Sequence, residues 1–506
     1  MLGMHMGKVP APSALEDQAD HPRRRDTCDW LLDINRASIV ANVESGLLEK
    51  ALARRIAEAL EAMEADWEKS PSRPELYITF EPELLKRCGM AASVLHVGRS
   101  SQDILATANA GLNLDRLERL IAASLEVVTA LGEVAEREKD AIVPAYTNGV
   151  QAQPTLFAHT LNAHQQAFLR DIDRAFECLS RHDACPMGSA VCNGTGWPLN
   201  SERMAKLLGF AKTCDNAYDA GQVAGNDLPL EISQVVTSLM LHVNAFLADF
   251  MTQYGQVKPW IRLGGMNGVY RSSAMPQKRN PGLVNDCRRD AGLVVGEAQG
   301  VLMRMQNLPY GMADIRDCRM MEALADDAAI TLRTFADIVR NLVVDHERAL
   351  AELNADWSCT QEIADRFVRL GKVDFRSAHR YASRLVTWAR NEGVTPVTIT
   401  YADATRLWQE FLVDAQKDAA EAQAGLPAEL PLDDAAFRSA LNPKDIVAAR
   451  ATHGSASPAE TARLLMHAKA RGATYETRLE TIARRRESAH EAINAVLAMT
   501  LARVEL

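Results

Sequence analysis

Long stretches of apolar residues at helical spacing are the feature that most constrains this chain. Between residues 115 and 139, leucine, isoleucine and valine recur at steps of three and four, which places them on one face of a helix. Residues 230–256 are apolar on more than one face, as expected of a helix buried on several sides. Residues 283–306 and 320–353 have similar patterns. These long stretches predict an all-α fold built around a long helical bundle.

The predicted helices are shorter on both sides of this central part, and strand-like alternation is scarce. We therefore expect a polar N-terminal tail over residues 1–28 and an N-terminal helical cap over 29–113. A central bundle with the active-site segments follows over 114–353, and a C-terminal helical cap over 354–506. The central helices are more apolar than a monomeric bundle needs, which predicts that the bundle forms a homo-oligomer.

Composition excludes several classes of protein. The formal net charge of −10 argues against a nucleic-acid-binding groove, which needs a concentrated face of Lys and Arg. None of the nine cysteines forms a CxxC pair, so we expect reduced thiols, no metal and no cofactor. No uninterrupted apolar run reaches about 18 residues, so we expect no membrane span. The N-terminus lacks the apolar segment of a signal peptide, and we therefore expect a cytoplasmic protein. The net charge does not exclude a small anionic substrate, because local pockets decide which small molecules bind.

The segment over residues 264–282, GGMNGVYRSSAMPQKRNPG, lies between two of the long helical patterns. Its glycines allow the backbone conformations that a mobile loop needs. Asn280 and Pro281 fit the start of the following helix, where exposed backbone N–H groups favour a bound anion. Lys278 adds a full positive charge. On these local grounds an anion-binding loop and a solvated basic loop both remain open.

Three segments resemble a known family. Residues 272–281, SSAMPQKRNP, closely resemble the SSxMPxKxNP signature of the aspartase/fumarase superfamily. Residues 95–103, LHVGRSSQD, and 146–154, YTNGVQAQP, resemble the segments LHTGRSRND and YTHLQRAQP of its argininosuccinate lyase branch. Further likeness at residues 186–189 and 441–460 extends the resemblance over nearly the whole chain.

The resemblance implies an anti β-elimination that releases fumarate from an N-substituted aspartate. A base removes the Cβ proton beside a carboxylate, and the resulting dianion needs fixed hydrogen-bond donors and positive charge before the Cα–N bond breaks. By the family pattern Ser272 is the base, and Lys278 and Asn280 are the positive and hydrogen-bonding groups of the catalytic set. The residues implied to bind substrate are Arg99, Ser100, Ser101, Gln102, Thr147, Asn148, Ser273, Met275 and Arg316.

The resemblance also implies a homotetramer in which three different chains build each site and closure of the glycine-rich loop excludes water. One assignment has a structural alternative, because Arg99 and Asp103 could form an internal ion pair instead of contacting substrate.

Departures from the family pattern concern the leaving group. Ser101 and Gln102 stand where argininosuccinate lyases carry Arg and Asn, and Asn148 replaces a titratable His. Arg316 stands where an uncharged donor is expected, which favours an additional carboxylate on the substrate. We therefore expect an amine that carries its own carboxylate, as in aminopolycarboxylates such as ethylenediamine-N,N′-disuccinate, whose lyase belongs to the same branch.

Three alternatives remain open. The first is authentic cleavage of argininosuccinate to arginine and fumarate. The second is a non-catalytic structural homologue, which the intact set of Ser272, Lys278 and Asn280 disfavours. The third is elimination of nitrite or of a sulfur nucleophile in place of an amine.

Overall fold

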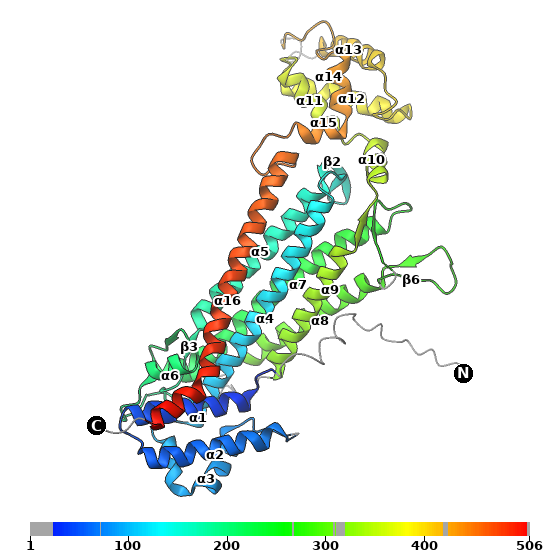
Figure 1. The fold of residues 1–506 in the computed structure, drawn as a ribbon. Coiled ribbons are helices and arrows are strands. Elements are labelled where there is room, and N and C mark those ends of the chain that lie inside the picture. The colour runs from blue at the N-terminus through cyan, green and yellow to red at the C-terminus, as the bar shows by residue number, and fades with distance from the viewer. Residues whose placement is uncertain are drawn as a thin grey trace.

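In the computed structural model of the chain, residues 24–70, 72–265, 268–306, 309, 319–417 and 424–502 are described. They form an elongated, mainly helical molecule with a long bundle at its centre (Figure 1). The predicted all-α fold class is confirmed.

The bundle consists of long helices that run side by side. α4 (Ser101–Arg137) packs against α5 (Phe157–His182) and α9 (Arg319–Arg340), while α7 (Ala224–Tyr254) packs against α8 (Gly282–Met305). Buried residues of α5 recur at helical spacing, for example Leu161, Phe168 and Ile172, because only one stripe of the helix faces the core. A last helix, α16 (Pro458–Ala502), returns along α4 and α5 (Figure 1).

A group of shorter helices lies at the lower end of the bundle in Figure 1. It contains α1 (Thr27–Glu44), α2 (Lys50–Glu68), α3 (Tyr77–Cys88) and the 3₁₀ helix η1 (Met90–His96). α1 is buried on nearly every face, because α2, α4 and α16 all pack against it.

A second group of helices lies at the opposite end and has a hydrophobic core of its own. Phe367 stacks on Tyr381 at 4.9 Å between ring centroids, and Trp408 packs edge-on against both rings. The helices of this group are α11 (Thr360–Arg369), α12 (Phe375–Asn391), α13 (Tyr401–Ala415), α14 (Asp434–Leu441) and α15 (Pro443–Ala448). α10 (His346–Ala355) precedes them and packs against β1, and its Ala349 belongs to the main core.

Short strands and minor helices connect these parts. β1 (Ile142–Thr147) pairs with β2 (Val150–Leu156), and β6 (Tyr270–Arg271) with β7 (Arg279–Asn280), both antiparallel. The other described pairs are β3 (Ala184–Cys185) with β4 (Lys212–Thr213), and β5 (Ile261–Leu263) with β8 (Leu342–Val344). α6 (Ser201–Leu207) and a single π-helical turn, η2 (Asp219–Val223), precede α7.

The structure divides the chain differently from the predicted three regions. The boundary expected between residues 113 and 114 falls inside the continuous helix α4. Residues of α16 such as Ala468, Tyr475 and Ile493 belong to the main core and not to a C-terminal cap. The apolar pattern of a buried helix face is the same whichever core the helix joins. The sequence pattern therefore could not show that α16 packs in the main core and not in a C-terminal cap.

The helix over η2 and α7 is long enough for a membrane span and contains an 18-residue window with a mean hydropathy of 1.4. It is the single such helix among the residues that the structure describes. Because α5, α8 and α9 all pack against α7, we interpret it as the core helix of the bundle.

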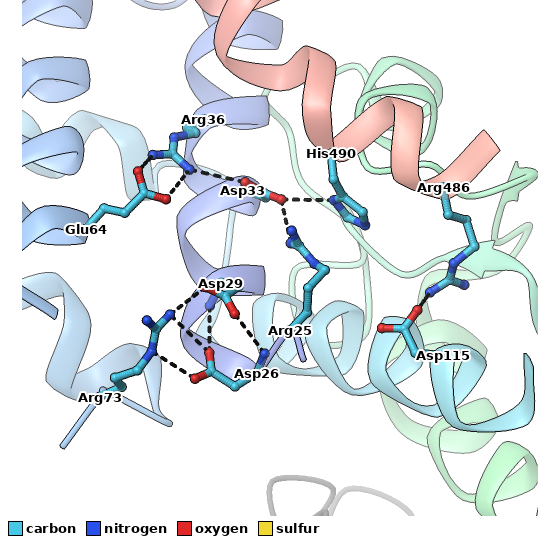
Figure 2. Close-up of polar contacts among 10 residues, drawn as sticks. All are labelled: Arg25, Asp26, Asp29, Asp33, Arg36, Glu64, Arg73, Asp115, Arg486 and His490. Carbon is cyan, nitrogen blue, oxygen red and sulfur yellow. Dashed lines mark hydrogen bonds and ion pairs between the residues drawn. The ribbon is translucent and has the colours of Figure 1, made fainter. Parts of the chain in front are cut away.

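A buried ionic cluster joins the two ends of the chain. Asp33 of α1 accepts hydrogen bonds from Arg25 at 2.5 Å, from Arg36 at 3.3 Å and from His490 of α16 at 2.9 Å (Figure 2). Burial raises the pKa of the Asp33 carboxyl, but the His490 hydrogen bond and the charges of Arg25 and Arg36 outweigh it and lower that pKa. The carboxylate therefore stabilises the fold above the unfolded-state pKa of about 3.9, and this contribution disappears as the pH falls through the lower folded value.

Replacing the central carboxylate tests this cluster. We expect Asp33→Asn to lower the free energy of unfolding by about 1–3 kcal/mol at pH 7, because it removes the buried anion that Arg25 and Arg36 face, while Arg36 keeps its pair with Glu64. The matched control is Asp66→Asn, whose pair with Arg87 is 66% exposed at the carboxylate and should contribute less than about 1 kcal/mol. Urea denaturation measures both variants, and an equal loss in the two would contradict the assignment.

Candidate active site

The SSAMPQKRNP segment forms a hairpin that projects from the bundle beside α8 (Figure 1). β6 and β7 pair Tyr270 with Asn280 and Arg271 with Arg279. Inside the hairpin the Ser272 N–H donates to the Lys278 carbonyl at 3.1 Å, and the Lys278 N–H donates to the Met275 carbonyl at 3.0 Å. These backbone hydrogen bonds shape the loop that holds Ser272.

The Ser272 hydroxyl oxygen, Oγ, accepts hydrogen bonds from two backbone N–H groups of its own loop. The Ala274 N–H lies 3.4 Å away and the Met275 N–H 3.2 Å away. Donors aimed at an oxygen stabilise its deprotonated form more than its neutral form. These two backbone N–H groups therefore orient the Ser272 side chain within its loop.

Positive charge gathers on the same hairpin. Arg271, Lys278 and Arg279 are all exposed, and Arg279 also donates to the Pro276 carbonyl at 2.6 Å. Tyr254 at the end of α7 donates its hydroxyl proton to the Arg279 carbonyl at 3.0 Å, which anchors the hairpin to the bundle. Ser273 and Met275 are exposed, and Ser272 and Asn280 are half-buried. The loop thus presents positively charged side chains and serine hydroxyl groups to a substrate or a neighbouring chain that covers it.

The second segment begins α4. Ser100 is the N-cap, and its hydroxyl accepts the Gln102 N–H at 3.2 Å. Gln102 donates through Nε2 to the Gly221 carbonyl of η2 at 3.1 Å, while Ser101 is exposed. Together with the exposed N–H groups of the first turn, these side chains offer donors for an anion.

Asp103 connects this helix start to a neighbouring loop. Its fully buried carboxylate accepts the Ser100 N–H at 2.7 Å, the Gly188 N–H at 3.3 Å and the Ala190 N–H at 3.2 Å. Burial raises the pKa of Asp103, and these hydrogen bonds oppose that effect. The Ser-x-x-Asp spacing is a capping-box pattern, which could have identified this role from sequence.

The loop that Asp103 holds has a strained backbone. Val191 lies at φ +80°, where β-branched residues are rare, and Gln222 of η2 donates to its carbonyl at 2.9 Å. A Cβ on Gly221 would lie 2.1 Å from the same carbonyl oxygen, so only glycine fits there. Strained backbone and π-helical turns both cluster at functional sites.

Arg99 points away from the helix start and into the protein. Its buried guanidinium donates to the Asn35 side-chain oxygen at 3.1 Å, to the Ser38 hydroxyl at 2.9 Å and to the Tyr77 hydroxyl at 3.1 Å. The expected substrate contact of Arg99 is therefore not available in this conformation. The structure favours a positioning role, in which Arg99 fixes the loop that precedes Ser100.

The third segment is a tight β-hairpin. Asn148 and Gly149 lie at φ +53° and +76° between Thr147 and Val150, which pair across the turn. Asn-Gly is the preferred sequence for such a two-residue turn. The identity of Asn148 therefore has a conformational reason besides any contact with substrate. Both Thr147 and Asn148 are exposed.

The three segments do not meet within one chain. Ser101 begins α4 and Thr147 follows its far end, and a helix of 37 residues is about 55 Å long. The hairpin of Ser272 lies toward the Thr147 end of α4. Trp260, which precedes β5, packs edge-on against Phe157, which follows β2, with 5.9 Å between the two ring centroids. Arg316 lies outside the described residues. A cavity of about 1370 Å³ between α1, α4 and α16 is lined by none of the site residues expected from sequence.

Comparison with known proteins identifies the family. A family model described as "Lyase" matches residues 24–296. Argininosuccinate lyase 2 of Agrobacterium fabrum is 30% identical over 448 residues, which cover 85% of this chain and 84% of that protein. Argininosuccinate lyase of Alteromonas mediterranea is 31% identical over 368 residues, or 72% of this chain and 78% of that protein.

Solved structures share the fold. An EDDS lyase in complex with formate superposes with a TM-score of 0.82 at 24% identity, over 94% of this chain and 92% of that chain. A class II fumarase from Schistosoma mansoni gives a TM-score of 0.61 at 14% identity, over 78% and 88%. The chain belongs to this lyase family. It is a carbon–nitrogen lyase of the aspartase/fumarase superfamily.

The positioning role of Asp103 is testable. We expect Asp103→Ala to lower the free energy of unfolding by about 2–4 kcal/mol, because it removes a cap and leaves the part-buried Gly188 and Ala190 N–H groups without this acceptor. Turnover should also fall, since Ser100–Gln102 lose their position. The control is Asp403→Ala, which breaks the same type of capping box at α13 and should cost about 1 kcal/mol with turnover unchanged. Unfolding and rate measurements on both variants decide, and normal turnover in Asp103→Ala would contradict the role.

Proposed function

We propose that the enzyme releases fumarate from an N-substituted aspartate by β-elimination, with Ser272 as the general base. The observation that carries this proposal is the pair of backbone N–H groups, of Ala274 and Met275, that donate to the Ser272 hydroxyl oxygen. They supply the activation that a serine needs in order to act as a base.

The proposed steps follow from this arrangement. Ser272, as an alkoxide, takes the Cβ proton, and the electron pair moves into the neighbouring carboxylate to give a dianion. Lys278 and Asn280 stabilise that dianion by charge and hydrogen bonding. The electron pair then returns to form the C=C bond while the Cα–N bond breaks. The substrate nitrogen is already protonated as an ammonium and takes the bonding pair as it leaves as a neutral amine, so no histidine is required at Asn148.

We propose that each site is completed by several chains of a homotetramer. The length of α4 supports this, because it keeps Ser100–Gln102 far from Thr147 and from Ser272 of the same chain. The exposure of the hairpin supports it too, since Ser273, Met275 and Lys278 are exposed and Ser272 is only half-buried, so that a cover from another chain is needed to exclude water. Outward-facing Leu241, Leu293 and Met303 on α7 and α8 supply apolar surface for chain contacts.

We propose an aminopolycarboxylate or an N-succinyl amine with its own carboxylate as the substrate. Arg271, Lys278 and Arg279 on one loop suit a substrate with more negative charge than a single succinyl group carries. The fold likeness to EDDS lyase agrees with this choice, whereas the identity to argininosuccinate lyases favours argininosuccinate as the alternative. Cytoplasmic location is supported by the free thiols of all the cysteines that the structure describes.

Fumarate release tests the base and the substrate together. We expect Ser272→Ala to lower kcat by at least about 10³ with little change in KM, because a general base acts in the transition state. The control is Ser383→Ala, an exposed serine on α12, which should retain full activity. Absorbance of fumarate from ethylenediamine-N,N′-disuccinate, N-succinyl amino acids and argininosuccinate measures the rates. Turnover of argininosuccinate alone would contradict the substrate assignment, and an active Ser272→Ala would contradict the base.

Mixed oligomers test the sharing of sites. Ser272→Ala and Thr147→Val should each lower turnover by at least about 10²-fold, because each removes an interaction with the reacting groups. Co-assembly of the two should restore part of the activity, since some sites then receive an intact segment from each chain. Ser272→Ala mixed with Lys278→Met should stay inactive, because neither chain has an intact hairpin. No recovery in the first mixture, or equal recovery in both, would contradict shared sites.

A further inference from the structure

Three potential metal ligands converge where α5 meets α7. Cys178 and His182 lie four residues apart in the last turns of α5 and therefore on one face of that helix. Glu231 faces them from α7. The Cys178 sulfur, a ring nitrogen of His182 and a carboxylate oxygen of Glu231 all lie within 4.8 Å of one another. The His182 Nε2 to Glu231 Oε1 distance is 3.0 Å.

These distances are close to those of a tetrahedral site. Bonds of about 2.0–2.1 Å to nitrogen and oxygen give an edge of roughly 3.3 Å between two ligands. The His182 nitrogen and the Glu231 oxygen are thus almost in place to bind an ion, and the Cys178 sulfur must move by no more than roughly 1 Å. A thiolate, an imidazole and a carboxylate form a ligand set that suits Zn²⁺, a borderline-soft ion.

We propose that Cys178, His182 and Glu231 form a binding site for a thiophilic divalent cation, with Zn²⁺ as the best match and water as the fourth ligand. The Cys178 thiol gives its proton to solvent when the ion binds. The thiolate and the carboxylate then balance the two charges of the ion, so the site is neutral overall. A neutral set of ion and ligands avoids the cost of an unpaired charge beside the buried Cys178 sulfur.

Arg181 is compatible with this site. It donates through its terminal nitrogen to Glu231 Oε2 at 2.5 Å and keeps contact with Oε1 at 3.2 Å. A carboxylate can bind a metal through one oxygen while its other oxygen accepts a hydrogen bond, and such outer partners orient metal ligands. Because the Arg181 side chain is 54% exposed, releasing its second contact costs little.

The site has an entry path and a structural consequence. A cavity of about 280 Å³ borders His182 and Arg181 and also touches β4, η2 and the start of α7. His182 ends α5 directly before β3, and the loop that Asp103 holds begins just beyond β3. A bound ion would therefore fasten α5 to α7 beside the loop that positions Ser100–Gln102. The lack of CxxC pairs predicts no metal site, but it overlooks a Cys and a His spaced by one helical turn.

Cobalt binding tests the proposal without any need for turnover. The full-length protein is dialysed against a chelator, and Co²⁺ is added while the thiolate-to-cobalt absorption is recorded. Competition with a chromophoric chelator then gives the Zn²⁺ affinity and stoichiometry. We expect one ion per chain, a thiolate band, and a higher melting temperature with Zn²⁺.

Matched variants identify the ligands. Cys178→Ser should abolish the thiolate band and weaken Zn²⁺ binding at least tenfold, whereas the control Cys214→Ser, on the wall of the neighbouring cavity, should change neither. His182→Gln and Glu231→Gln should weaken binding similarly, so the test survives if one variant fails to fold. Absence of a thiolate band in the wild-type protein, or a band that persists in Cys178→Ser, would overturn the proposal.

Discussion

The packing of α4 within the bundle is the constraint on which the rest of the structure depends. α4 is a continuous helix of 37 residues held by α5, α9 and α16, and its two ends therefore lie about 55 Å apart. The Ser100–Gln102 segment and the Thr147 turn are consequently fixed far apart in each chain. A site that needs both must draw them from different chains, which makes association a condition for chemistry under the proposed function.

Each segment is preorganised by a different local device. Backbone hydrogen bonds shape the Ser272 hairpin, a capping box and a strained loop hold Ser100–Gln102, and an Asn-Gly turn presents Thr147. None of these local interactions involves another of the three site segments in the same chain. Each of the three segments is thus positioned by its own rigid helix or hairpin. This suits an enzyme whose hydrogen-bond donors must already be in position when negative charge develops in the transition state.

The sequence predicted the fold class and the family, because helical periodicity and a long ordered motif are both local patterns. It could not assign α16 or the side-chain direction of Arg99, since those depend on which distant surface each residue meets. From the sequence, Asn148 was interpreted as a substrate-binding residue. Its positive φ gives a second reason for an asparagine there, because the tight turn needs this backbone conformation. Cys178 and Glu231 are 53 positions apart in the printed sequence and meet only through helix packing.

The most direct test of the central claim runs the proposed reaction in reverse, with fumarate and ethylenediamine or an amino acid in D₂O. The account predicts that fumarate is consumed and that the N-substituted aspartate carries a single deuterium at Cβ, delivered anti to the new C–N bond. Proton NMR coupling constants of the product read this stereochemistry. If fumarate is not consumed with any amine, or if deuterium is delivered to both faces of Cβ, β-elimination by a single positioned base is contradicted.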